Sequence, residues 1–186
     1  MAVGSLVERV SLGVIGRART TGEVVGAVSV AVNGLLAEAP PPSPVAPAFA
    51  LDVARGVIRG ASHVGGDLRS AAEGMVIGML RGTAPDAEAL RTIRTTVRSL
   101  VHATASAGGD LGGAARGAVD GAIVGARELG VDTAAAAAAA ARVALGTAAA
   151  VGGAPEDAVQ VATRAISGLE AGALPRNGHG RSLRRH

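Results

Sequence analysis

Residues 65–82 read GGDLRSAAEGMVIGMLRG, and residues 108–125 read GGDLGGAARGAVDGAIVG. Both stretches open on GGDL, continue through a pair of alanines, and carry three glycines spaced four residues apart. The glycine at the second position recurs along the chain at Gly22, Gly66, Gly109 and Gly153, with spacings of 44, 43 and 44 residues. Such a regular period indicates a repeat architecture with one supersecondary unit in each period.

Each period predicts two helices joined by a glycine. Apolar residues recur at steps of three and four, and the alternation typical of strands is never sustained. A glycine ends a helix well because it adopts the left-handed conformation, and Asp67 or Asp110 directly after it would cap the next helix. We therefore expect an all-α fold of four helical-hairpin repeats of about 44 residues, elongated and assembled as an oligomeric bundle or tube.

The same signals give the expected boundaries. We expect helices near 4–20, 23–38, 48–64, 67–82, 86–107, 110–129, 134–151 and 155–170. The prolines of residues 40–47 cannot continue a helix and favour a stiff, extended spacer. The expected organisation is repeat 1 in residues 1–39, a Pro-rich linker in 40–47, repeats 2 to 4 in 48–171, and a disordered basic tail in 172–186.

The composition is poor in large core residues. Hydrophobic residues make up 48% of the 186 residues, but they are mainly Ala and Val, with one Phe and no Tyr or Trp. Burial contributes about 25 cal/mol per Å² of apolar surface, while ordering the backbone costs about 1–2 kcal/mol per residue. We therefore expect a homo-oligomer or a complex subunit. The absence of cysteine excludes disulfides and thiolate zinc sites.

The positive charge lies in the tail. All 18 basic residues are Arg; residues 1–175 hold 14 of them against 15 acids, and residues 176–186 hold four Arg and no acid. The body of the protein thus lacks the broad basic footprint of a nucleic-acid-binding protein. The apolar stretch from Val24 to Ala37 is shorter than the ~20 residues that span a bilayer, and Arg142 interrupts the Ala-rich stretch, so we expect neither to span a membrane.

Rows of glycine at four-residue spacing predict faces for close helix packing, since residues four apart lie on one side of a helix. The candidate packing residues are Gly74, Gly78, Gly82, Gly113, Gly117, Gly121 and Gly125. Larger apolar residues lie beside them, and these would line either an ordinary core or a lumen for a lipophile such as a quinone. The candidate lining residues are Met75, Met79, Leu80, Val119, Ile123 and Val124.

One predicted helix is amphipathic, with Arg91, Arg94, Arg98 and His102 on one face. Arg55, Arg59 and His63 repeat this spacing one period earlier. Such a face is either simply solvated or binds an acidic partner or lipid headgroups. The sequence contains no GxSxG, HExxH or P-loop motif, and the histidines have no carboxylates at ligand spacing, so we expect no catalytic residue, no metal and no enzymatic activity.

The run from Gly108 to Gly130, GGDLGGAARGAVDGAIVGARELG, resembles Ala/Gly-rich bacterial helical repeat proteins. With its Arg-for-Lys bias and its size, the whole chain resembles the small stalk or scaffold subunit of the actinobacterial Huc-type nickel–iron uptake hydrogenase. That resemblance implies a non-enzymatic oligomer that gathers the hydrogenase large and small subunits. It also implies a cytoplasmic location at the inner membrane and a hydrophobic conduit that binds menaquinone non-covalently.

A second class of function fits the same composition. Phasin-like coat proteins cover a lipid or polymer granule with amphipathic helices and organise no enzyme. The two classes differ in their partners: a scaffold would be isolated with redox subunits, and a coat with granule proteins.

Overall fold

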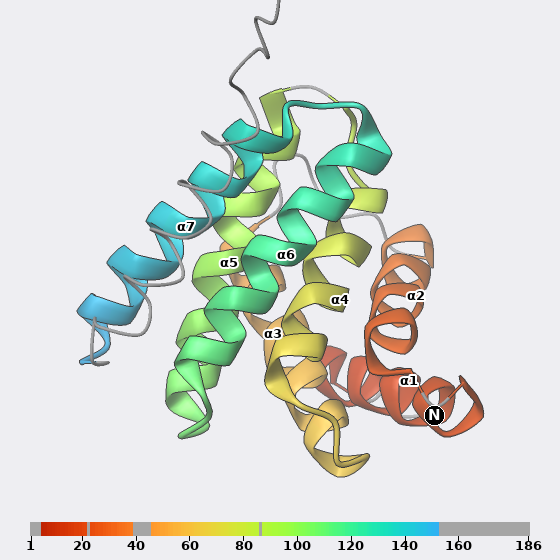
Figure 1. Cartoon of the computed structure of the whole chain (residues 1–186). Helices are drawn as coiled ribbons and strands as arrows, with labels where there is room; N and C mark the ends of the chain where they lie inside the picture. The colour runs from red at the N-terminus through yellow and green to blue at the C-terminus, as the bar shows by residue number, and fades with distance from the viewer. Residues whose placement is uncertain (1–4, 22, 39–45, 86, 153–186) are drawn as a thin grey trace, which may run out of the picture.

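The fold is all-α. The computed structural model describes residues 5–21, 23–38, 46–85 and 87–152, and it contains no strand in these ranges. Seven helices make up the described chain (Figure 1): α1 Leu6–Thr21, α2 Val24–Glu38, α3 Pro47–His63, α4 Leu68–Arg81, α5 Ala87–Ser106, α6 Leu111–Leu129 and α7 Thr133–Ala150.

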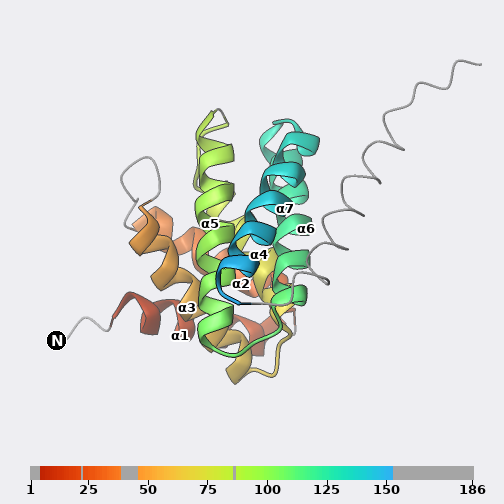
Figure 2. The same cartoon turned by 90° about the vertical axis from the view of Figure 1, so that its left-hand side faces the viewer.

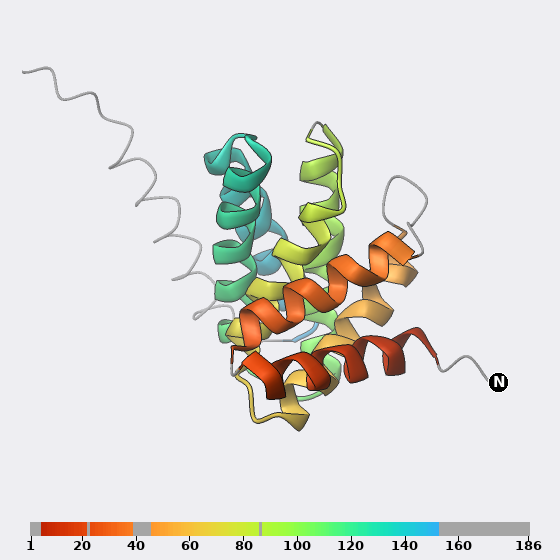
Figure 3. The ribbon, with the colours of Figure 1, turned by 90° about the vertical axis from the view of Figure 1, so that its right-hand side faces the viewer.

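The helices form two layers. The odd-numbered helices pack in the order α1, α3, α5, α7, and the even-numbered helices pack in the order α2, α4, α6. From α3 onward, each helix therefore packs on the helix two positions earlier in the chain as well as on its neighbour in sequence. Figure 2 shows α5, α6 and α7 gathered at one end of the molecule, and Figure 3 shows α1 and α2 at the other.

The seven described helices begin and end within about two residues of the expected boundaries. They comprise three consecutive pairs and α7. The expected helix at 155–170 and the tail 172–186 lie outside the described residues, as do residues 39–45 of the expected linker. Its last two residues, Ala46 and Pro47, lie at the start of α3.

Left-handed glycines follow four helices. Gly130, with φ of 71°, ends α6 where the sequence predicts that helix to stop, whereas Gly65, Gly108 and Gly152, with φ of 70°, 66° and 78°, each lie one residue before the repeating glycine. The amide of Gly66 donates to the carbonyl of Ala61 at 2.9 Å, and Gly109 makes the same bond to Thr104. This six-residue closure is the Schellman motif. Gly66 and Gly109 complete it and also let the chain pass close to α2 and α4.

Aspartates start the following helices, as the sequence predicts. The Asp67 carboxylate accepts from the backbone amide of Ser70 at 2.8 Å, and Asp110 accepts from Gly113 at 2.9 Å. Asp132 caps the Ala-rich helix α7 through the amides of Ala134 and Ala135. An acid at this position satisfies an otherwise unpaired amide and interacts favourably with the helix dipole.

Glycines bring the even helices into contact with one another. A Cβ added to Gly74 of α4 would lie 2.5 Å from the carbonyl oxygen of Val25 in α2, and one added to Gly78 would lie 2.7 Å from that of Ser29. On α6, a Cβ on Gly121 would lie 2.6 Å from the carbonyl oxygen of Glu73 in α4. Only glycine permits this approach.

The odd layer uses the same device between its first two helices. A Cβ on Gly56 of α3 would lie 2.6 Å from the Val10 Cβ in α1, and one on Gly60 would lie 2.8 Å from the Val14 Cβ. The valines of one helix therefore sit directly over the glycines of the next. Both layers thus combine a ridge of β-branched residues with a groove made by glycine.

An arginine links the three even helices. Arg81 of α4 donates two hydrogen bonds of 2.8 Å to the carboxylate of Glu128 on α6 and one of 2.8 Å to the hydroxyl of Ser29 on α2. Arg69 makes a second link between α4 and α6 through Asp120 at 2.8 Å. Burial raises the pKa of Glu73, and the negative charge of Asp120 adds to this rise.

Helix α7 alone among the described helices is long and apolar enough to cross a membrane by length and composition, and 39% of that 18-residue segment is buried inside the protein. In the structure it packs on α5 and α6. Its buried side consists of alanines, and Arg142 near its centre is exposed.

We predict that Gly121→Ala lowers the free energy of unfolding by about 1–3 kcal/mol, because the new methyl group would overlap the backbone of α4. Gly146→Ala on α7 is the matched control, since a Cβ there meets nothing within 4 Å. The control should raise stability by about 0.5–1 kcal/mol through its higher helix propensity. Urea unfolding measures both, and equal effects would contradict the close approach of α4 and α6.

We predict that Glu128→Gln lowers stability at neutral pH by about 0.5–1 kcal/mol, the range of a well-formed surface ion pair. The hydrogen bonds from Arg81 hold the pKa of Glu128 below its ordinary value. The contribution is therefore present above the unfolded-state value of about 4.3 and is lost as the pH falls through the folded-state pKa. Unfolding measured from pH 7 down to pH 3 should show the two proteins converging; a difference independent of pH would contradict this role.

Candidate functional site

Six of the seven candidate packing glycines lie between helices. Gly74 and Gly78 face α2, and Gly117, Gly121 and Gly125 face α4. Gly82, which follows α4, would bring a Cβ to 2.6 Å from the Leu36 side chain. Gly113 differs, because a Cβ there meets only the Asp110 carboxylate of its own helix start. It accordingly belongs to the N-terminal cap of α6.

The candidate lining residues divide into two groups. Met75, Met79 and Leu80 have no exposed surface, and Val119 is 3% exposed. Ile123 and Val124 on α6 are half-buried. The first group packs in the hydrophobic core of this chain, so only Ile123 and Val124 could touch a molecule from outside.

The two layers differ in charge. Nine arginines and three acids belong to the odd helices, a net charge of +6, of which α3, α5 and α7 carry +4; four arginines and four acids belong to α2, α4 and α6, a net charge of zero. The six arginines of α3, α5 and α7 are all exposed: Arg55, Arg59, Arg91, Arg94, Arg98 and Arg142. We refer to these six residues as the arginine face.

The arginine face is also poor in ion pairs. Arg55 lies 3.4 Å from Asp52 one turn away, and its other members make no ion pair with another described residue. In the even layer, by contrast, Arg69 and Arg81 are held by carboxylates at 2.8 Å. The even-layer pairs join helices, whereas the five members of the arginine face other than Arg55 make no ion pair with a described residue and can meet an anion.

Helix α5 shows the amphipathic division that its sequence predicts. Arg91, Arg94, Arg98 and His102 are exposed, while Ile93, Val97 and Val101 are fully buried. On α3, Arg55, Arg59 and His63 are likewise exposed. Since α3 and α5 are neighbours in the odd layer, the two rows of basic side chains lie on adjacent helices.

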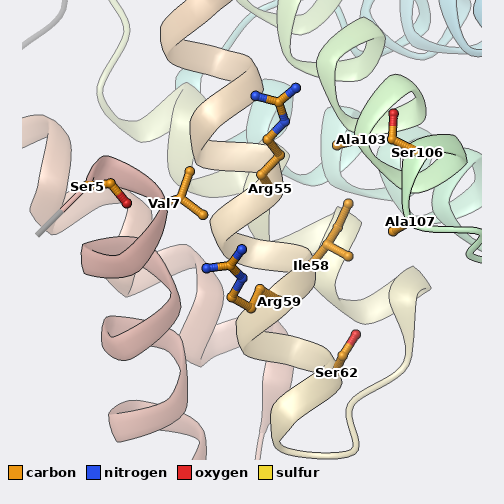
Figure 4. Close-up of a pocket in the computed structure, with 9 residues that line it drawn as sticks. All are labelled: Ser5, Val7, Arg55, Ile58, Arg59, Ser62, Ala103, Ser106 and Ala107. Carbon is orange, nitrogen blue, oxygen red and sulfur yellow. The ribbon is translucent and has the colours of Figure 1, made fainter.

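A groove of about 460 Å³ lies where α1, α3 and α5 meet (Figure 4). Arg59 extends from α3 toward α1, and Ile58 extends toward α5. Hydroxyl groups from three helices and small apolar side chains complete the wall, which is lined by Ser5, Val7, Arg55, Ile58, Arg59, Ser62, Ala103, Ser106 and Ala107. Two guanidinium groups beside hydroxyls and an apolar wall suit a carboxylate-bearing side chain or headgroup.

Sequence reasoning identified Arg55 and Arg59 but missed the groove. Its wall combines residues more than 100 positions apart, Ser5 on one side and Ala107 on the other. A period of 44 residues predicts the helical repeat unit but not how successive units stack. The sequence alone therefore does not indicate that these groove residues lie close together. Among the described residues, no group of three or more His, Asp or Glu side chains could hold a metal ion.

Comparison of the chain with protein-family models, with curated proteins and with solved structures finds no match.

Proposed function

We propose that this protein is a non-enzymatic helical scaffold that assembles with its own copies and holds an acidic protein partner on the arginine face. The observation that carries the proposal is the net charge of +4 on α3, α5 and α7 against zero on α2, α4 and α6. Unpaired, exposed arginines steer and bind an acidic surface, and Arg is favoured at protein interfaces for its planar, multidentate donors.

The stacked helices support this function. Each inner helix pair is held on the previous one through glycine contacts, and such an arrangement displays an extended surface. The fourth repeat of the proposed architecture would be completed by residues 155–170. A row of helices with arginines on one side presents several equivalent attachment points along its length.

The resemblance to the hydrogenase stalk subunit supplies the first partners to test, the large and small subunits of an uptake hydrogenase at the inner membrane. A conduit for menaquinone is part of that proposal. Because Met75, Met79 and Leu80 are enclosed within the chain, its wall would be built between subunits from half-buried residues such as Ile123 and Val124.

The phasin-like alternative is favoured less by the geometry. A coat protein presents the apolar faces of its helices to a granule. Here the apolar faces of α4 and α5 are buried against other helices, and Leu12 and Val30 are the exposed large hydrophobic residues of the described chain. A coating function would require the two layers to separate.

The test is co-purification of the tagged full chain from its native host, with Arg94→Glu and Arg98→Glu combined in one variant. Quantitative mass spectrometry should find redox-enzyme subunits with the unmodified chain and at least about tenfold less with the variant, which corresponds to about 1.4 kcal/mol of binding. Arg116→Glu with Arg127→Glu on α6 is the matched control, since both residues are exposed in the neutral layer.

Neither pair of substitutions removes an ion pair between described residues, so both variants should fold with stability close to that of the unmodified chain. Equal loss of the partner in both variants would show that the arginine face is not the docking surface. Granule proteins in place of redox subunits would support the coating function instead.

A further inference from the structure

The groove where α1, α3 and α5 meet has the dimensions of a site for a small molecule. Its volume of about 460 Å³ lies within the range of about 300 to 1,000 Å³ that is usual for such sites. Of its nine lining residues, four are apolar, two are arginines and three are serines. An apolar wall with a few polar groups is typical of a surface that binds and orients a small ligand.

The charged and the apolar parts of the groove lie on different sides. Arg59 extends from α3 toward α1, whereas Ile58 extends toward α5, which contributes Ala103 and Ala107 to the wall (Figure 4). A molecule that fills the groove therefore meets a guanidinium group near α1 and hydrocarbon near α5. This separation fits an amphiphile, with a charged group at one end and an apolar body at the other.

The charges of the groove select an anion. No Asp or Glu is among the residues that line it, and Arg59 makes no ion pair with another described residue. Arg55 has only a contact of 3.4 Å with Asp52 one turn away, and both of these side chains are about half exposed. A carboxylate offers two acceptor oxygens to the parallel N–H donors of a guanidinium group, so it can pair with Arg59 without displacing another acid.

The repeat register gives an independent indication for the apolar part. Ser5 and Val7 lie 44 residues before Phe49 and Leu51, at the corresponding positions of the next repeat. Phe49 and Leu51 are partly buried and pack against the hydrophobic core. Ser5 is exposed and lines the groove. The first repeat thus has a small hydroxyl where the next repeat has an aromatic ring, which leaves room for hydrocarbon at this position.

We propose that the groove binds an amphiphilic monocarboxylate, a molecule in which one carboxylate is joined to a short hydrocarbon body. The carboxylate pairs with Arg59 and is flanked by Arg55. The hydrocarbon lies over Ile58 against the alanines of α5. It supplies the apolar group that Ser5 lacks in comparison with Phe49.

Both parts of the ligand are needed to use both sides of the groove. A small inorganic anion would gain only contacts with exposed guanidinium groups, which contribute little in water. A hydrocarbon without charge would cover the apolar wall but leave Arg59 without a partner. In an amphiphilic carboxylate, burial of the methylene groups adds to the ion pair, and the two groups together orient the molecule in the groove.

This binding goes beyond the scaffold function, and its test involves no protein partner. The probe is octanoate, titrated into the full chain by calorimetry. A ligand with about ten non-hydrogen atoms should bind saturably with a Kd of about 1 mM or tighter. In nuclear magnetic resonance spectra, the amide signals of Ser62, Ala103 and Ala107 should shift with octanoate, whereas that of Gly146 on α7 should not, since it lies outside the groove.

Two further probes separate the charge of the ligand from its chain. Acetate carries the carboxylate without the chain, and octylammonium carries the same chain with the opposite charge. Each should bind at least about tenfold more weakly than octanoate. Acetate that binds as tightly as octanoate would show that the apolar wall has no part in binding, and octylammonium that binds as tightly would show the same for the arginines. Either result would overturn the proposal.

Arg59→Gln should weaken octanoate binding at least about tenfold. Arg116→Gln on α6 is the matched control, because it removes the same charge from an exposed residue outside the groove and should leave binding unchanged. Neither substitution removes an ion pair between described residues, so both variants should keep the fold. Ser62→Phe provides a second disruption, since a ring on this exposed lining residue would occupy the groove and exclude octanoate.

Three further results would overturn the proposal. The first is octanoate binding that shows no saturation up to about 10 mM, tenfold above the expected Kd. The second is equal weakening by Arg59→Gln and Arg116→Gln, which would assign the binding to overall charge. The third is a set of amide shifts outside the groove. The acidic protein partner is judged separately, because its experiment changes Arg94 and Arg98, which do not line the groove.

Discussion

The contact between a glycine and the backbone of the helix two positions earlier is the interaction on which this structure depends. Removing Cβ at Gly74, Gly78 and Gly121 lets carbonyl groups of the previous even helix approach the glycine Cα directly. Weak Cα–H···O contacts and dense van der Waals packing then become available. Each glycine within a helix costs about 1 kcal/mol relative to alanine, so the close approach must offset that loss.

The same contact explains how a chain with so few aromatic residues forms a core. When helices approach closely, alanine and valine fill the space between them. The larger residues are concentrated on α4 and α5, where Met75, Met79, Leu80, Ile93 and Leu100 are fully buried. The sequence-based argument that alanine buries little surface considered side chains alone and neglected the backbone surface that glycine allows to be covered.

The sequence was informative about single elements and uninformative about their arrangement. It predicted the helices and the capping by Asp67 and Asp110, and it placed the glycine ends within one residue, because these depend on residues within one turn of each other. It did not predict that α4 packs on α2 and α6, nor the groove that joins Ser5 to Ala107, because a repeating period does not specify the direction of stacking. The exposure of Leu12 and Val30 follows from that stacking and could not be predicted from the sequence without it.

The proposed function rests on where charges stay unpaired. Arginines that join helices are matched by acids, as Arg81 is by Glu128, while those of the arginine face are exposed. The exposed arginines are the surface that the proposed acidic partner would contact.

The most direct test of the glycine contact is a set of nuclear Overhauser measurements between glycine Hα protons and valine methyl groups in the full chain. A Cβ on Gly121 would lie 3.0 Å from the Val76 Cβ, and one on Gly78 would lie 2.9 Å from the Val32 Cβ. The structure predicts strong cross-peaks from Gly121 to Val76 and from Gly78 to Val32. Glycine Hα protons that show contacts only within their own helix would contradict the stacking on which the account depends.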